Sequence, residues 1–199
     1  MKKTNTFLIF TSFLVIFFAV SCGQQQKKNK EKSVSQSAVE NSNTPQHPSA
    51  EELFDRLLAS FGDDWMEREA DPNLYPEYYG GAFINNNGMF VVAVTGNKEE
   101  HKRHLTEILG TDHFNVETVQ YSYRQMMRVM DNIDAFLMNS TVPEDHPLMS
   151  SFAGAYPDVM ENRVKVLLTK VDDTTIRLFQ KDIVNSPLIK FEQGELPAY

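Results

Sequence analysis

The sequence predicts an α+β fold made of two related β-β-α-β units. A hairpin segment, Tyr79 to Phe83, recurs as Phe152 to Tyr156, and the strand Phe90 to Thr95 that completes the first hairpin recurs as Val164 to Thr169. Each copy is followed by a capped amphipathic helix and a short strand with apolar residues at alternate positions. We therefore expect two units with antiparallel sheets packed on helices, at about residues 78–121 and 151–193.

Two further helices are expected outside the repeat. Ser49 and Glu52 form a capping box that opens a helix over about residues 50–61, and Ser122 caps a helix over about 122–138 that connects the units. The segment between residues 63 and 79 contains two prolines and is expected to be irregular. Pro157 in the second hairpin predicts a frayed first strand there.

The N-terminus has the features of an export signal. Lys2 and Lys3 precede an apolar run, Phe7 to Val20, that is too short for a comfortable membrane anchor. The run ends just before Cys22, the only cysteine of the chain. This arrangement resembles the lipobox of bacterial lipoproteins, although Ala19 stands where leucine is usual. It predicts a lipoprotein signal peptide over residues 1–21 and a lipid, palmitate, on Cys22; the alternative is an ordinary secretory signal with an incidental cysteine.

A polar segment separates this signal from the folded part. Residues 22–48 are rich in Gln, Ser, Asn and Lys and contain almost no large apolar residue, which predicts a disordered tether. Its lysines can rest against anionic lipid headgroups. Residues 49–199 would then form the α+β domain.

The charge distribution argues against nucleic acid as a partner. The chain has a net charge of −8, and residues 49–199 hold 25 acidic against 13 basic side chains. A phosphate backbone requires a basic surface, and an acidic domain repels it.

Three segments resemble the prodomain of bacterial trypsin-like proteases of the α-lytic protease and streptogrisin kind. They are the hairpin from Tyr79 to Thr95 (YGGAFINNNGMFVVAVT), the strand-to-helix junction from Val119 to Met126 (VQYSYRQM), and the strand from Asn162 to Val166 (NRVKV). The resemblance as a whole extends over roughly half of the chain, in three pieces, and its motifs are structural rather than catalytic.

The resemblance implies a folding aid or inhibitor that lays a sheet edge against a protease. No nucleophile segment like GDSGG is present, and we expect no protease domain in this chain. Two strands are the candidate docking edges. Their candidate contact residues are Phe90, Val92, Val94, Val164, Val166 and Leu168.

An aromatic group before the first hairpin is a second candidate surface, because tyrosine and tryptophan are enriched in binding patches. Its members are Trp65, Tyr75, Tyr78 and Tyr79. The alternative is that these rings pack the proline-containing segment onto the sheet.

The sequence offers no convincing catalytic, metal or cofactor site. His101 and His104 lie one helical turn apart, but charged neighbours mark a solvated face, and Asp112 and His113 lie past the end of that helix. No serine occurs in a nucleophile elbow. We therefore expect a protein that is not an enzyme and that takes no metal or cofactor.

These observations together predict a lipid-anchored envelope protein with a protein- or peptide-binding module. The residues after Cys22 lack an acidic run, and by resemblance to Bacteroidetes-type lipoproteins this favours the outer membrane, facing the periplasm. The alternative is a structural spacer lipoprotein with no binding activity.

Overall fold

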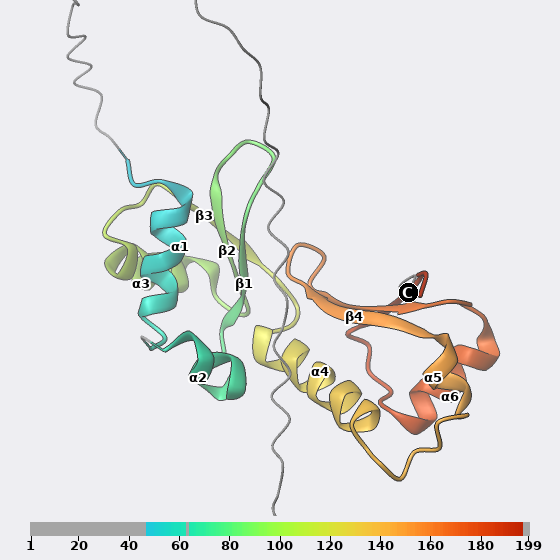
Figure 1. Cartoon of the computed structure of the whole chain (residues 1–199). Coiled ribbons are helices and arrows are strands. Elements are labelled where there is room, and N and C mark those ends of the chain that lie inside the picture. Colours follow the sequence, from blue (N-terminus) through green and yellow to red (C-terminus); the bar gives the residue numbers. More distant parts are fainter. Residues whose placement is uncertain (1–46, 63, 197–199) are drawn as a thin grey trace, which may run out of the picture. The chain divides into compact units, whose positions relative to one another are not determined.

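The computed structural model describes residues 47–62 and 64–196 (Figure 1). The predicted signal peptide, Cys22 and nearly all of the predicted tether lie outside these residues. Within the described ranges, no helix has the length and apolar character needed to cross a membrane. The fold is α+β, with two three-stranded sheets packed against helices, as predicted.

The first sheet has the strand order β1-β2-β3. Strands β1 (Tyr79–Ile84) and β2 (Phe90–Val94) form an antiparallel hairpin. Helix α3 (Lys98–Leu109) then returns the chain so that β3 (Asn115–Thr118) runs parallel to β2. Asn97 caps α3 by accepting hydrogen bonds from the N–H groups of Glu99 and Glu100.

The second sheet repeats this topology with the order β4-β5-β6. Strands β4 (Phe152–Asp158) and β5 (Arg163–Leu168) are antiparallel, and α6 (Asp173–Asp182) leads to β6 (Ile189–Gln193), which is parallel to β5. Both sheets are therefore mixed, and the prediction of antiparallel sheets is wrong. A helical crossover between neighbouring strands makes them parallel.

The two hairpins share an irregularity at the same place, which confirms the repeat. The register shifts between Tyr79 and Gly81 in one and between Phe152 and Gly154 in the other. Both glycines have positive φ angles, 118° and 150°, which glycine adopts more readily than residues with a Cβ. The predicted fraying of β4 is wrong, because its pairing with β5 continues through Asp158.

Helices α1 (Ala50–Ala59) and α4 (Tyr123–Leu137) confirm the two capping boxes, at Ser49 and Ser122. Three short helices were not predicted. These are α2 (Trp65–Ala70), the 3-10 helix η1 (Pro72–Leu74) and α5 (Pro147–Ser151). Asp64 caps α2 through the N–H groups of Met66 and Glu67, a local signal that the prolines downstream obscured.

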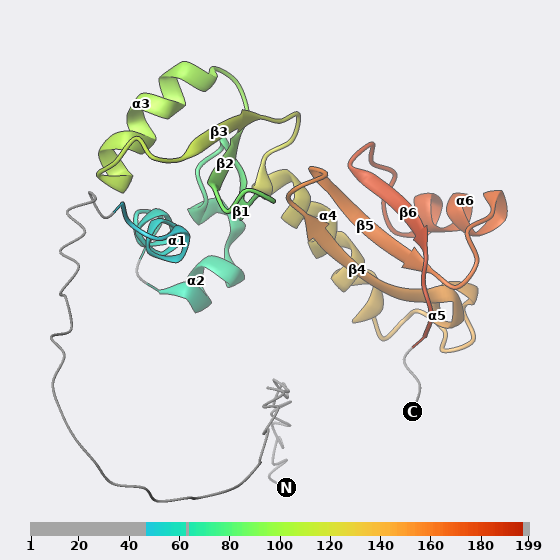
Figure 2. The same ribbon diagram turned by 90° about the horizontal axis from the view of Figure 1, so that it is seen from above.

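Each sheet has its own hydrophobic core on one face. Helices α1 and α3 cover the first sheet, and Leu53, Leu57 and Leu105 are almost fully buried against it. Helices α4 and α6 lie on the same face of the second sheet (Figure 2), where Ile133 and Phe179 are fully buried. The opposite face of the second sheet carries charged side chains.

Candidate binding surfaces

The predicted docking strands lie at the centres of the two sheets. Strand β2 pairs with β1 and β3, and β5 pairs with β4 and β6, so both edges of each strand are already hydrogen-bonded. The prediction that these strands offer a free edge is therefore wrong. Their candidate residues are all buried in the cores: Phe90, Val92, Val94, Val164, Val166 and Leu168.

The outer strand β6 has unpaired backbone groups in the part of the chain that the structure describes. The N–H of Val164 donates to Leu188 C=O at 2.9 Å, and the N–H of Gly194 donates to Leu168 C=O at 2.9 Å. Backbone groups of a strand point alternately to either side, so even-numbered residues of this segment face β5. The N–H and C=O groups of Phe191 and Gln193 therefore face away from the sheet.

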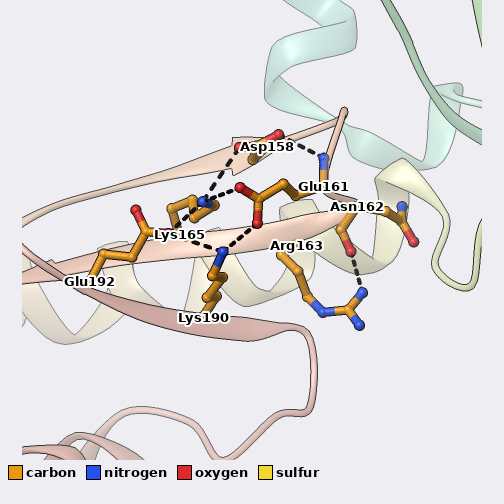
Figure 3. A network of polar contacts seen from close by, with 7 residues as sticks. All are labelled: Asp158, Glu161, Asn162, Arg163, Lys165, Lys190 and Glu192. Atoms are coloured by element: carbon orange, nitrogen blue, oxygen red, sulfur yellow. Dashed lines mark hydrogen bonds and ion pairs between the residues drawn. The ribbon is translucent and has the colours of Figure 1, made fainter.

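The face of the second sheet that lies opposite its helices holds a buried lysine (Figure 3). The side chain of Lys165, on the central strand β5, is only 5% exposed. Its Nζ lies 2.7 Å from Glu161 Oε1, 2.5 Å from Glu192 Oε1 and 3.7 Å from Asp158 Oδ2. Lys190 joins the network, with its Nζ 2.6 Å from Glu161 Oε2.

The charges in this network stabilise one another. Hydrogen bonds from Lys165 and then Lys190 lower the pKa of Glu161 to about 2. The hydrogen bond from Lys165 also lowers the pKa of Glu192. Hydrogen bonds to Glu161 and Glu192 outweigh burial and raise the pKa of Lys165. Glu161, Lys165 and Glu192 thus stay ionised at neutral pH and present fixed charges beside β6.

The turn between β4 and β5 is tied to the segment that joins the two units. Asn162, which is 5% exposed, has a φ of 53° and accepts hydrogen bonds from the N–H groups of Gln120 and Tyr121. The guanidinium of Arg163 lies 5.0 Å from the ring centroid of Tyr121. In the same turn, Val159 lies against Gly81 of β1. The hydrogen bonds from Gln120 and Tyr121 to Asn162 were not predicted from the sequence. Asparagine before a strand is nevertheless a common left-handed turn residue, and this signal could have indicated the turn.

The predicted aromatic group does not form one surface. Tyr75 and Tyr79 are buried and stacked, with ring centroids 5.7 Å apart, and they pack on Phe61 and Tyr123. They belong to the core, which is the alternative that the sequence left open. Tyr78 is half-buried and stacks on His101 at 4.4 Å. Trp65, on α2, is 65% exposed.

The histidines considered as metal ligands make aromatic contacts. Tyr78 also meets the edge of His104, and His113 stacks on His47. Among residues 47–62 and 64–196, no cluster of His, Cys, Asp or Glu is arranged to hold a metal ion.

Comparison with known protein families gives two adjoining matches. Residues 24–119 match the model of the Pro-like N-terminal domain, and residues 124–194 match that of the Pro-like C-terminal domain. The two matches together cover most of the chain, which is similar to a Pro-like domain pair over these residues. This pair is consistent with the prodomain-like fold that the three sequence segments predicted.

The boundary between the two matches falls between β3 and α4. The Pro-like N-terminal match contains α1 and the first sheet, whereas the Pro-like C-terminal match begins within α4 and contains the second sheet. The first match also starts at residue 24, inside the segment predicted as a tether. A search of curated proteins found no match to the chain.

Proposed function

We propose that this Pro-like domain pair is the binding module of a lipid-anchored envelope protein, and that it acts on a trypsin-like protease as a folding aid or inhibitor. In this proposal the module is not an enzyme. Cys22 carries the lipid at the outer membrane, and the module faces the periplasm. The partner protease pairs one of its strands with the free edge of β6.

The observation that carries this proposal is the outer edge of β6, which pairs with no other strand among residues 47–62 and 64–196. The backbone groups of Phe191 and Gln193 can hydrogen-bond to an added strand. The neighbouring charged network around Lys165 favours a partner with complementary charge. The other outer strand of this sheet, β4, is less suitable because Pro157 lacks an N–H donor.

A proline at residue 193 tests the strand pairing. Gln193→Pro removes an outward-facing N–H and the side-chain hydrogen bond from Gln193 to the C=O of Thr169, but it leaves the backbone hydrogen bonds between β5 and β6 in place, so the fold should survive. Thr118→Pro is the matched control, because Thr118 is an exposed residue of β3, the corresponding edge of the first sheet.

The measurement is the refolding of trypsin-like proteases from the same genome, each produced without a prodomain and denatured. We expect the full-length protein to raise the recovered protease, or to inhibit and co-elute with it, and Gln193→Pro to lose this effect while Thr118→Pro keeps it. If neither refolding, inhibition nor co-elution occurs with any of these proteases, the binding proposal fails and the spacer alternative replaces it.

Lipidation is tested separately by growing cells with radiolabelled palmitate. Wild-type protein should take up label and fractionate with the outer membrane, and Cys22→Ala should lose both properties. A wild-type protein that takes up no label contradicts the anchor without affecting the proposed strand pairing.

A further inference from the structure

A groove runs between α1 and the outer edge of β1 in the Pro-like N-terminal domain. It has a volume of about 300 Å³, and its floor consists of apolar side chains from α1, β1 and β2. Phe54 is 39% exposed there, and its ring meets the edge of Phe90 with centroids 6.5 Å apart. Ile84, on the opposite wall, is 48% exposed. Two large apolar side chains thus face solvent across one groove.

The wall formed by β1 also offers unpaired backbone groups. The N–H of Asn85 donates to Met89 C=O at 3.0 Å, so by alternation Phe83 is hydrogen-bonded to Val91. The backbone groups of Ala82 and Ile84 therefore point away from β2. Within residues 47–62 and 64–196, no strand pairs with this side of β1.

The side chains of Ala82 and Ile84 point into the groove. They pair with Val92 and Phe90 across the hairpin, and paired residues lie on the same face of a sheet. This is the face that α1 covers. A strand added to β1 would therefore place every second side chain beside Phe54, so backbone pairing and an apolar contact would occur together.

The charge of the groove selects among such strands. The charged residues in its lining are Glu51 and Asp55, both exposed on α1, and no basic side chain of the described residues lines it. The two carboxylates lie on the helix side of the apolar floor. A ligand with Lys or Arg flanking its apolar residues would be attracted, and an acidic one would be repelled.

From this combination we propose that the groove between α1 and β1 is a second peptide-binding site, which takes an extended segment of a partner protein whose groove-facing side chains are apolar at the centre and basic two residues to either side. The apolar side chain rests on Phe54 and Ile84, the backbone pairs with Ala82 and Ile84, and the basic side chains meet Glu51 and Asp55. The site lies on a different sheet from β6 and does not rest on the function proposed above.

The test uses a short fluorescent peptide with the pattern Lys-Thr-Val-Thr-Lys, in which Lys and Val point to the same face of the strand, and a matched peptide with Glu in place of Lys. Fluorescence anisotropy with the full chain should show binding of the Lys peptide and none of the Glu peptide. Phe54→Ala should weaken binding about tenfold, the usual effect of truncating a central apolar contact. Met138→Ala removes an 83% exposed apolar side chain elsewhere and should leave binding unchanged.

Two more variants test the wall formed by β1 and the charges. Ile84→Pro removes an outward-facing N–H together with the apolar contact of the Ile84 side chain, and it should abolish binding with an unchanged circular dichroism spectrum. The double variant Glu51→Lys/Asp55→Lys should prefer the Glu peptide. Gln193→Pro should bind the Lys peptide normally, which distinguishes this site from the edge of β6.

Four outcomes would overturn the proposal. Equal binding of both peptides, or binding unaffected by Phe54→Ala, would show that the groove does not select the ligand. A full chain that rejects the Lys peptide and is a dimer disrupted by Phe54→Ala would assign the groove to a second copy. Rejection of the peptide together with slow hydrogen exchange at Ala82 and Ile84 in the free monomer would assign it to the chain's own residues before 47.

Discussion

The side chain of Asn162 hydrogen-bonds the backbone of Tyr121 twice. Its Oδ1 accepts from the Tyr121 N–H at 2.8 Å, and its Nδ2 donates to the Tyr121 C=O at 2.8 Å. Oδ1 also accepts from the N–H of Gln120 at 3.1 Å. One buried amide in the β4–β5 turn thus satisfies three backbone groups of the segment that connects β3 to α4.

Removing this amide should destabilise the protein strongly. Three hydrogen bonds at about 1 kcal/mol each predict a loss of about 3 kcal/mol for Asn162→Gly, which keeps the left-handed backbone. Asn162→Ala should cost roughly 1 kcal/mol more, because alanine disfavours a φ of 53°. Urea unfolding of the three proteins measures both values. A glycine variant as stable as wild type would show that the amide contributes little.

The corresponding bulge glycines of the two hairpins should respond differently to alanine. A Cβ at Gly81 would lie 2.5 Å from Val159 Cγ1, whereas a Cβ at Gly154 would meet nothing within 4 Å. Both variants carry backbone strain of about 1–2 kcal/mol, and Gly81→Ala should lose about 1–3 kcal/mol more through overpacking.

A second change at Val159 identifies the source of this difference. Val159→Ala should recover part of the loss in the Gly81→Ala background and none in the Gly154→Ala background. A double-mutant cycle gives the coupling energy. Equal losses for the two glycine variants would contradict a contact between β1 and the β4–β5 turn.

The Lys165 network should make the free energy of unfolding decrease as the pH falls below 4.5. Glu161 has its pKa lowered from 4.5 to about 2, so its contribution to stability is complete above pH 4.5 and disappears as the pH falls toward 2. Glu161→Gln should therefore be less stable than wild type near neutral pH, and the difference should vanish at about pH 2. Urea midpoints measured across this range test the prediction, and a pH-independent difference would contradict it.

The phenol groups of the buried tyrosine cluster should ionise only at a higher pH than free tyrosine. Burial raises the pKa of Tyr123 to about 12 and that of Tyr79 further, from the ordinary value of 10.0. The stability from these neutral phenols is complete below pH 10 and is lost as the pH rises through the folded-state pKa. Ultraviolet titration should show both rings protonated until the protein unfolds. Titration near pH 10 in the folded protein would contradict their burial.

Local patterns allowed much of the fold to be predicted from sequence. Both capping boxes, Ser49 with Glu52 and Ser122 with Gln125, form reciprocal hydrogen bonds between side chain and backbone at the N-terminus of a helix. Such capping depends only on neighbouring residues. The repeat was recognisable because a bulge glycine is followed by an apolar strand in both hairpins, with one extra residue in the second turn. The position of each strand within its sheet depends on distant pairing and was predicted wrongly.

A sequence signal for the central position of β2 was nevertheless present. The unbroken apolar run from Phe90 to Val94 is typical of a strand buried on both faces, and all five residues are buried. In β5, Lys165 interrupts such a run and suggests a solvated face. Its three acidic neighbours come from β4, the following turn and β6, so only the folded sheet brings them together.

The position of Lys165 protects the chain against proteolysis, which matters for a protein proposed to bind trypsin-like proteases. The peptide bond after this lysine lies in the central strand of a sheet, and its side chain is held by carboxylates. A protease that cuts after lysine must bind an extended, unpaired segment, so cleavage there requires the sheet to open. The rate of degradation at this bond is therefore governed by the free energy of opening.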